Sequence, residues 1–148
     1  MKAVTISAKI LSLGAVMCGV LLLAGCESMG HLYPANELAE SASGEIPVHV
    51  TTLETGHGTM QAIGPAGEVL KGSYEPAPGS YDFGKIFKAV QGDFSTNPVH
   101  ADNGTPTIAT ITGNLGTNMQ CEFYNNDSTN NGFGGCKSVT GALYRLQY

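Results

Sequence analysis

The sequence predicts an all-β protein, built as a small antiparallel barrel or sandwich of about seven short strands. From Glu45 onward, apolar residues recur with a period of two residues and not with the period of 3.6 that is typical of helices. The apolar segments are short, and turns rich in glycine, proline and asparagine separate them. The 20 glycines of the 148-residue chain agree with an architecture that needs many turns.

Seven segments have the character of strands. In the first, Ile46, Val48 and Val50 alternate with other residues, as expected of a strand with one buried face. The sequence GPAG at positions 64–67 suits a tight turn and joins the second and third segments into a hairpin. The predicted strands are residues 46–51, 59–63, 68–74, 107–112, 118–124, 133–139 and 142–148.

Residues 81–90 (YDFGKIFKAV) carry two overlapping patterns. Tyr81 and Phe83 alternate as in a strand, whereas the apolar residues at positions 83, 86, 87 and 90 have the spacing of one helix face. We expect a strand that gives way to a short helix. Turn-forming residues then predict a loop over positions 91–106.

Two segments share a spacing that is consistent with a repeated hairpin. GTMQAIGPAGEVLK (58–71) and GFGGCKSVTGALYR (132–145) place small residues, a turn glycine and a basic residue at matching positions. Four matched positions in two copies also arise by chance, so both interpretations remain open.

The first 25 residues have the composition of an export signal. Lys2 and Lys9 are their only charged residues, and positions 10–24 form an uncharged, mostly apolar run. A membrane-spanning helix needs about 20 apolar residues, and this run is shorter and contains Gly14 and Gly19. The pattern therefore predicts export followed by cleavage.

The residues Leu23-Ala24-Gly25-Cys26 at the end of this run resemble the lipobox of bacterial lipoproteins. In that family the cysteine is lipidated and becomes the first residue of the mature chain. The resemblance implies that Cys26 carries the lipid and that the protein is attached to a membrane through it, with two or more acyl chains for stable attachment. An ordinary secretory signal, in which Cys26 has no special role, is the alternative.

The resemblance also implies a location in the cell envelope. In double-membraned bacteria, an aspartate directly after the lipidated cysteine typically keeps such a protein at the inner membrane. Here the residue is Glu27, followed by Ser28, which favours the outer membrane.

On this basis the chain divides into a lipoprotein signal peptide (1–25), a lipidated tether or linker (26–44) and a β-rich globular domain (45–148). The tether is expected because residues 27–44 show no strand alternation and are rich in small and polar side chains. A short helix over residues 35–42 is compatible with Asn36 and Glu37 near its start, although fewer than three turns are marginal in isolation.

The charge of the chain excludes one class of partner. Loss of Lys2 and Lys9 with the signal leaves five basic residues against twelve acidic ones, and changes the formal net charge from −5 to −7. No basic patch is available for nucleic acid or for anionic lipid head groups. We therefore expect no nucleic-acid partner.

The four cysteines are accounted for by the same topology. Cys18 leaves with the signal, Cys26 takes the lipid, and Cys121 and Cys136 remain in an oxidising compartment, where a remaining pair indicates a disulfide. The two cysteines lie symmetrically about a loop, so they would face each other across two antiparallel strands. Metal binding by this pair is the alternative, but two thiolates without a nearby histidine form only half of a site.

The C-terminal region resembles small bacterial lipoproteins of unassigned function. The resemblance covers roughly residues 113–148 and rests on the Cys-Glu-Phe sequence at 121–123 and on a Gly-x-Gly-x-Cys segment at 132–136. It implies a shared module and brings no catalytic residues.

Candidate metal sites are weak. His49 and His57 flank Glu54, but their spacing fixes no ligand geometry, and surface histidines are the simpler interpretation, as for His31 and His100. The loop NNDSTNNG (125–132) has the alternation of a calcium loop but lacks the glutamate required at its last position, and asparagine-rich turns form without an ion. We expect neither a metal nor a cofactor.

Catalytic patterns are also weak. No Gly-x-Ser-x-Gly elbow is present, and no Gly-x-Gly-x-x-Gly sequence opens a helix. Carboxylates scattered along the chain could meet in space as a hydrolytic pair, although separate surface acids are the simpler interpretation: Glu68, Glu75, Asp82 and Asp93.

The aromatic residues offer a possible binding surface. They would suit a sugar or a protein partner if they shared one face of the sheet; the alternative is that they form the core of a domain without tryptophan. The six residues are Tyr74, Tyr81, Phe123, Phe133, Tyr144 and Tyr148.

These observations lead to three hypotheses. The first is a lipid-anchored envelope protein whose small β-domain is a non-enzymatic binding or structural module for a protein or a glycan. The second is an inhibitor of a host enzyme such as lysozyme, because lysozyme-inhibitor lipoproteins share the size, anchor, disulfide and β architecture, although their motif is not visible in this sequence. The third is a small periplasmic hydrolase.

Overall fold

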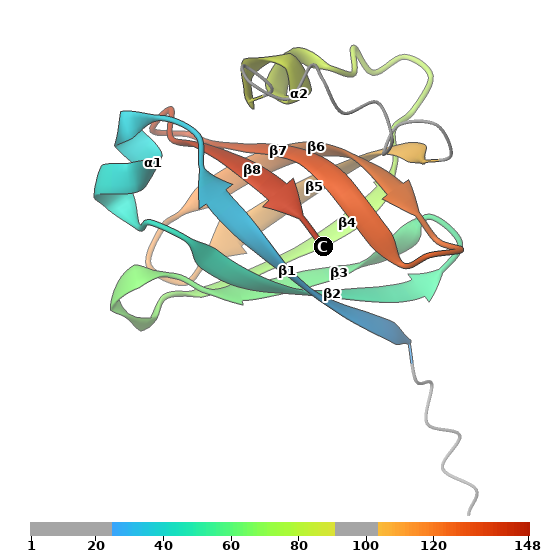
Figure 1. The fold of residues 1–148 in the computed structure, drawn as a ribbon, viewed down its shortest axis with the longest axis horizontal. Coiled ribbons are helices and arrows are strands. Elements are labelled where there is room, and N and C mark those ends of the chain that lie inside the picture. The colour runs from blue at the N-terminus through green and yellow to red at the C-terminus, as the bar shows by residue number, and fades with distance from the viewer. Residues whose placement is uncertain (1–24, 91–103) are drawn as a thin grey trace, which may run out of the picture.

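The computed structural model describes residues 25–90 and 104–148, and these form a closed antiparallel barrel (Figure 1). Each strand pairs with its neighbour in sequence, and the first pairs with the last to close the barrel. The strands within the described residues are β1 (Cys26–Pro34), β2 (Ile46–Glu54), β3 (His57–Ile63), β4 (Val69–Pro76), β5 (Thr105–Gly113), β6 (Asn118–Asn126), β7 (Asn131–Ser138) and β8 (Leu143–Gln147). The predicted all-β, antiparallel architecture is confirmed in its barrel form.

The expected tether over residues 26–44 is wrong, because its first part forms strand β1. Residues 26–34 pair with β2 on one side and with β8 on the other, so the barrel begins at Cys26 and not at Glu45. The sequence shows no alternation here because Gly30 faces the interior, where an added Cβ would lie only 2.3 Å from the Cβ of Tyr148. The aromatic residue fills the space that an apolar side chain on β1 would otherwise occupy.

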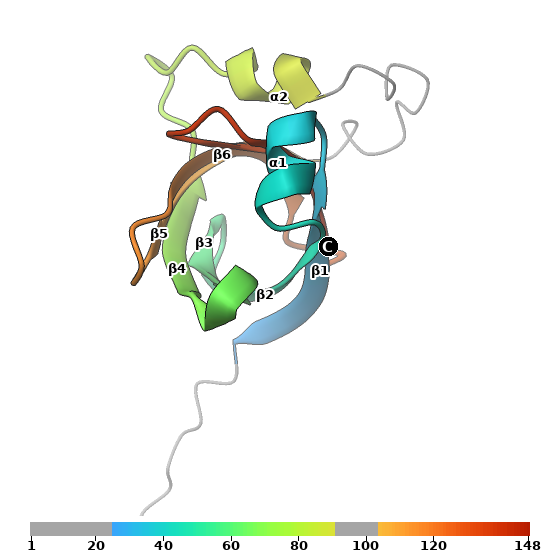
Figure 2. The same ribbon diagram turned by 90° about the vertical axis from the view of Figure 1, so that its left-hand side faces the viewer.

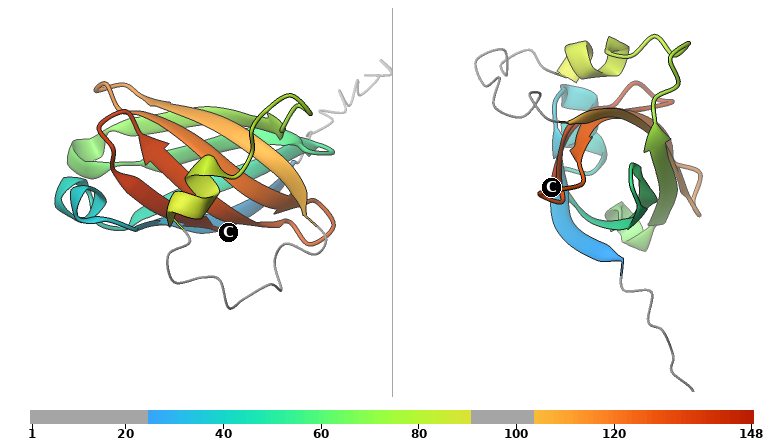
Figure 3. Two further views of the ribbon diagram at one scale, coloured as in Figure 1. Left: turned by 90° about the horizontal axis from the view of Figure 1, so that it is seen from above. Right: turned by 90° about the vertical axis from the view of Figure 1, so that its right-hand side faces the viewer.

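Residues 81–90 form a helix without the expected strand. The helix α2 (Lys85–Val90) lies across the outside of the barrel over β6, β7 and β8 (Figure 3). Gly84, directly before it, has a φ of 108°, a left-handed conformation that favours glycine. Residues 81–84 pair with no strand, and most of the expected loop over 91–106 lies outside the described residues.

Side chains fill the inside of the barrel. Its largest buried apolar members come from six different strands and include Phe123, Leu32, Met60, Leu70 and Leu146. The disulfide between Cys121 and Cys136 lies among them, joining directly opposed residues of β6 and β7 whose Cα atoms are 4.0 Å apart. The predicted disulfide and its cross-strand position are confirmed.

The two ends of the barrel differ. At the end that we call the base, β1 begins at Cys26 and the short turns 55–56 and 127–130 join strands. At the opposite end, which we call the mouth, the helix α1 (Glu37–Ala42) connects β1 to β2 and lies at one side of the opening, beside β1 and β8 (Figure 2). The 3-10 turn η1 (Pro65–Gly67) and the turns 114–117 and 139–142 surround the same opening.

The helix α1 is held at the mouth by Asn36. The side-chain oxygen of Asn36 accepts a 3.0 Å hydrogen bond from the N–H of Ala39, which caps the helix. The same oxygen accepts from the N–H of Leu143, while its amide donates to the carbonyl of Gly141. The expected short helix is therefore present, and its stability comes from packing on the barrel.

The two similar segments occupy equivalent positions. They form the β3–β4 and β7–β8 hairpins, both of which turn at the mouth. Gly67 and Gly141 in the turns have φ values of 77° and 90°, and Ala62 and Cys136 are both buried in the core. The shared spacing therefore corresponds to a shared local structure.

Candidate functional site

The six aromatic residues do not share one surface. Tyr74, Phe123, Phe133 and Tyr144 are buried, so the core interpretation holds for these four. Tyr81 is exposed beside α2, and the partly buried Tyr148 packs against the core. Phe133 and Tyr148 line a small hollow of about 140 Å³ near the base, and Tyr144 reaches the mouth.

Hydrogen-bonded polar side chains occupy the base. The hydroxyl of Tyr74 lies 2.9 Å from Oγ1 of Thr52, which donates to the side-chain oxygen of Asn130. Tyr148 donates to the side-chain oxygen of Asn125, whose amide donates to Asp127. Burial of Tyr148, reinforced by the nearby Tyr74 and Asp127, raises the pKa of its hydroxyl. These side chains serve to hold the turns of the base together.

A pocket opens at the mouth beneath α1. It has a volume of about 280 Å³, close to the lower end of the range for ligand sites, and barrel mouths are a common place for such sites. Its lining combines apolar side chains with hydroxyl groups: Ala42, Ser43, Ile46, Pro65, Ala66, Leu70, Leu115, Thr117, Met119, Ser138, Thr140, Ala142 and Tyr144, together with Glu68. This composition suits an apolar group that carries a polar end.

The hydroxyl groups in this pocket bond to one another. Oγ of Ser43 lies 2.6 Å from the hydroxyl of Tyr144, which links the end of α1 to β8. Oγ of Ser138 lies 2.7 Å from Oγ1 of Thr140 and accepts from the N–H of Ala142. Tyr144 was among the aromatic candidates from the sequence, but Ser43, Ser138 and Thr140 were not, because serine and threonine in turns carry no signal of a shared pocket.

Glu68 is the charged residue of the pocket lining. Its Oε1 accepts from the N–H groups of Leu115 and Thr117 at 3.1 and 3.0 Å, and its Oε2 accepts from the hydroxyl of Thr117 at 2.6 Å. The hydrogen bond from the Thr117 side chain, helped by the backbone donors, lowers the pKa of Glu68 below its usual value. The carboxylate therefore stays ionised and shapes the turn between β5 and β6.

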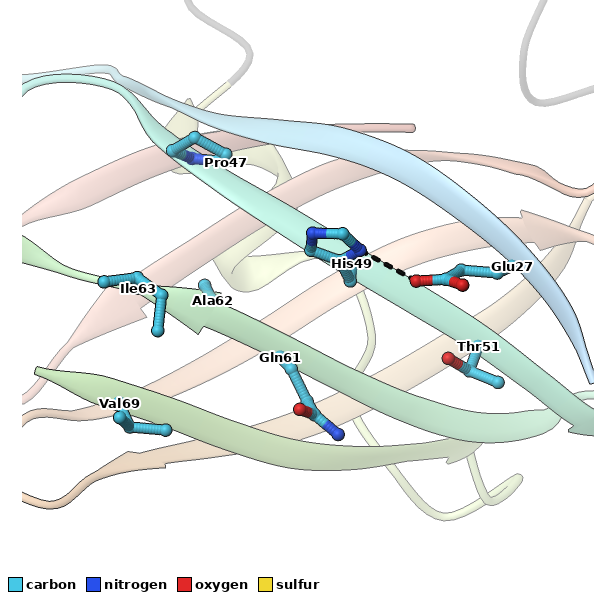
Figure 4. A pocket seen from close by; sticks show the side chains of 8 residues that line it. All are labelled: Glu27, Pro47, His49, Thr51, Gln61, Ala62, Ile63 and Val69. Carbon is cyan, nitrogen blue, oxygen red and sulfur yellow. Dashed lines mark hydrogen bonds and ion pairs between the residues drawn. The ribbon is translucent and has the colours of Figure 1, made fainter.

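A second hollow lies on the outside of the barrel (Figure 4). It has a volume of about 470 Å³ and is open, with His49 on β2 facing Glu27 on β1 across 2.8 Å. Both side chains of this pair are about half exposed, which makes the ion pair weak. The remaining lining residues come from β2, β3 and β4: Pro47, Thr51, Gln61, Ala62, Ile63 and Val69.

A buried carboxylate, Glu122, attaches α2 to the barrel. Glu122 is only 1% exposed on the outer side of β6, and its Oε2 accepts from the N–H groups of Gly84, Ile86 and Phe87. Its Oε1 accepts from the hydroxyl of Tyr81 at 3.0 Å, and burial, together with this bond, raises the pKa of Tyr81. The anion thus satisfies the free donors at the helix N-terminus.

Among residues 25–90 and 104–148, no three His, Cys, Asp or Glu side chains lie together as metal ligands would. His49 pairs with Glu27, whereas His57 lies 3.9 Å from Glu54, so the proposed cluster does not assemble. His31 lies on β1, and His100 falls outside the described residues. In the loop, Asn126 accepts hydrogen bonds from Ser128 and Thr129, which accounts for the turn without an ion.

The acids considered for hydrolysis are dispersed. Glu68 lies at the mouth beside the first residue of β4, and Glu75 lies near the other end of that strand. Asp82 pairs with Lys85 at 2.9 Å, and Asp93 falls outside the described residues. Among Glu68, Glu75 and Asp82, only Glu68 lines one of the pockets described in this section.

Cys26 is exposed and has a free thiol at the first position of β1. The rest of the lipobox, apart from Gly25, falls outside the described residues. Within the two ranges that the structure describes, no helix has the length and apolar character to cross a membrane.

Comparisons with known proteins give no family assignment. No protein-family model matches the chain, and neither the curated proteins nor the solved structures contain a significant match to it.

Proposed function

We propose that this protein is a lipid-anchored, non-enzymatic binding module of the cell envelope, held at the outer membrane. The observation that carries the proposal is the position of Cys26: an exposed, free cysteine at the end of a lipobox-like sequence and at the first residue of the barrel wall. An acyl group on this cysteine would project from the base without disturbing any core contact.

The lipid would also orient the barrel. Because Cys26 is itself the first residue of β1, no tether would separate the lipid from the barrel. The base would therefore lie directly at the membrane. The mouth, with α1 and its pocket, would then face away from the membrane, since it lies at the opposite end of the barrel (Figure 1). A strand of nine residues spans roughly 30 Å, which sets the distance between lipid and mouth.

The chemistry of the mouth supports binding as the activity. Its lining combines apolar surface with hydroxyl groups and one ionised carboxylate, Glu68. Glu68 is already held by Leu115 and Thr117, and its lowered pKa is opposite in direction to that of a general acid working near neutral pH. The residues at this site are thus arranged for recognition.

The anchor is tested by fractionation of cells that express the full chain. The wild-type protein should partition into the detergent phase and with outer-membrane markers, whereas Cys26→Ser should lose the lipid and leave the detergent phase. Glu27→Gln, next to the anchor, is the matched control and should stay in the membrane. A wild-type protein that partitions like Cys26→Ser would refute the proposal.

A further inference from the structure

Exposed apolar residues gather around the mouth. Three of the seven large hydrophobic side chains that are exposed in the described residues lie on its connections. Leu38 belongs to α1, Leu115 lies in the turn 114–117, and Val139 lies in the turn 139–142. They are 56–75% exposed. We call these three residues the apolar rim.

The apolar rim is continuous with the pocket. Leu115 contributes to both, and the pocket lining includes neighbours of the other two, Ala42 in α1 and Thr140 in the turn 139–142. Exposed apolar side chains beside a pocket are typical of a surface that a macromolecule covers. A small ligand in the pocket would leave Leu38 and Val139 in water.

The connections at the mouth carry charge of one sign. Residues 35–45, 64–68, 114–117 and 139–142 contain four glutamates and no lysine, arginine or histidine. Glu37 and Glu40 are exposed on α1, and Glu68 lies in the pocket wall. A partner with basic residues would be attracted to this end, whereas a second copy of the chain or an anionic lipid surface would be repelled.

We propose that the mouth docks a basic segment of a partner protein, which inserts one large apolar side chain into the pocket and places flanking lysine or arginine residues against Glu37 and Glu40. The inference rests on the binding-module function proposed above, but it does not depend on the lipid anchor. The apolar rim surrounds the inserted side chain and excludes water from it.

The test uses three synthetic hexapeptides and the protein purified from cells that express the full chain. The protein is taken from the soluble or the membrane fraction, according to where it is found. One peptide has two leucines between lysines, the second has two leucines between glutamates, and the third has two serines between lysines. Binding is followed by amide chemical shifts of the labelled protein. Only the first peptide should bind measurably, with shifts confined to the mouth.

Matched variants identify the surface. Leu115→Ser should weaken binding of the first peptide about fivefold, because it removes contact area from the rim. Leu53→Ser, which changes a leucine of nearly equal exposure on β2 near the base, should leave binding unchanged. The pair Glu37→Gln and Glu40→Gln should weaken binding about threefold at low salt, whereas Glu75→Gln should not.

Several outcomes would overturn the inference. They are no shifts at the mouth, equal binding of the glutamate peptide, or equal loss with Leu115→Ser and Leu53→Ser. Dimerisation that Leu115→Ser abolishes would assign the rim to a second copy, and co-sedimentation with vesicles through the rim would assign it to lipid. Peptide binding by an unlipidated protein would refute the anchor alone, and a membrane-bound protein without peptide binding would refute the docking alone.

Discussion

Glu122 on β6 accepts a 2.9 Å hydrogen bond from the backbone N–H of Ile86 in the first turn of α2, across 36 residues of sequence. The same carboxylate oxygen accepts from Gly84 and Phe87, and the residue is 1% exposed. Three backbone N–H groups and the hydroxyl of Tyr81 donate to this side chain. The position of α2 on the barrel therefore depends on one buried carboxyl group.

Replacing Glu122 with glutamine should detach α2. Glutamine has only one acceptor oxygen, so either the helix N–H groups or the Tyr81 hydroxyl would lose its carboxylate acceptor, at a cost of about 2 kcal/mol. Urea unfolding should show this loss for Glu122→Gln, and hydrogen exchange should increase in residues 84–90. The exposed Glu75→Gln is the control; equal stability of the two variants would contradict the account.

Gly135 should be required for the close approach of the same helix. A Cβ at this position would lie 2.6 Å from Cγ2 and 2.9 Å from Cβ of Val90, so the short valine side chain could not move aside. Gly135→Ala should cost about 1–3 kcal/mol and expose α2 to proteolysis. At Gly64 an added Cβ would meet nothing closer than 3.5 Å, so Gly64→Ala should resist proteolysis like the wild type. Equal cleavage of both variants would show that α2 does not rest on β7.

Removing the disulfide should weaken the barrel without changing its topology. Cys121 and Cys136 close a loop of 15 residues, for which the chain-entropy model gives about 3 kcal/mol. In a Cys26→Ser background, the double variant Cys121→Ala and Cys136→Ala should lose about that much free energy of unfolding. Urea titration measures it against the Cys26→Ser parent. A loss close to zero would mean that the bond adds nothing to the paired strands.

Stability should depend on pH through Glu68. Hydrogen bonds from Thr117 lower its pKa in the folded protein, so the folded state favours the ionised form. The resulting stabilisation is present above the pKa of the unfolded chain and is lost as the pH falls through the lower folded value. The difference in unfolding free energy between wild type and Glu68→Gln should therefore be constant near neutral pH and shrink in acid. A difference that grows in acid would contradict the mechanism.

The sequence predicted the strands with several apolar inward residues and missed β1, whose inward face has Ser28, Gly30 and Leu32 and thus a single large apolar side chain. Seven strands could be placed because alternation such as that of Ile46, Val48 and Val50 records a buried face. Strand β1 carries Gly30 at a buried position, so its place in the barrel depends on Tyr148, a residue more than 100 positions away. No local pattern contains that information.

The candidate site was predicted less completely. The disulfide followed from the symmetry of two cysteines about a turn, a local feature. The mouth pocket instead combines Ser43, Glu68, Thr117 and Tyr144, which come from distant segments and meet only because the barrel closes. The prediction of a shared aromatic surface was wrong for the same reason. Phe123 and Tyr144 are apolar enough to be buried, and closure of the barrel placed them inside.

The intact mass of the mature protein, purified from the membranes of cells expressing the full chain, tests the central claim most directly. The account predicts a chain that starts at Cys26 and carries an added mass equal to its acyl groups, and it predicts that Cys26→Ser lacks this mass. A wild-type chain with an unmodified Cys26, or one that still carries residues 1–25, would contradict the anchor and the orientation of the mouth that follows from it.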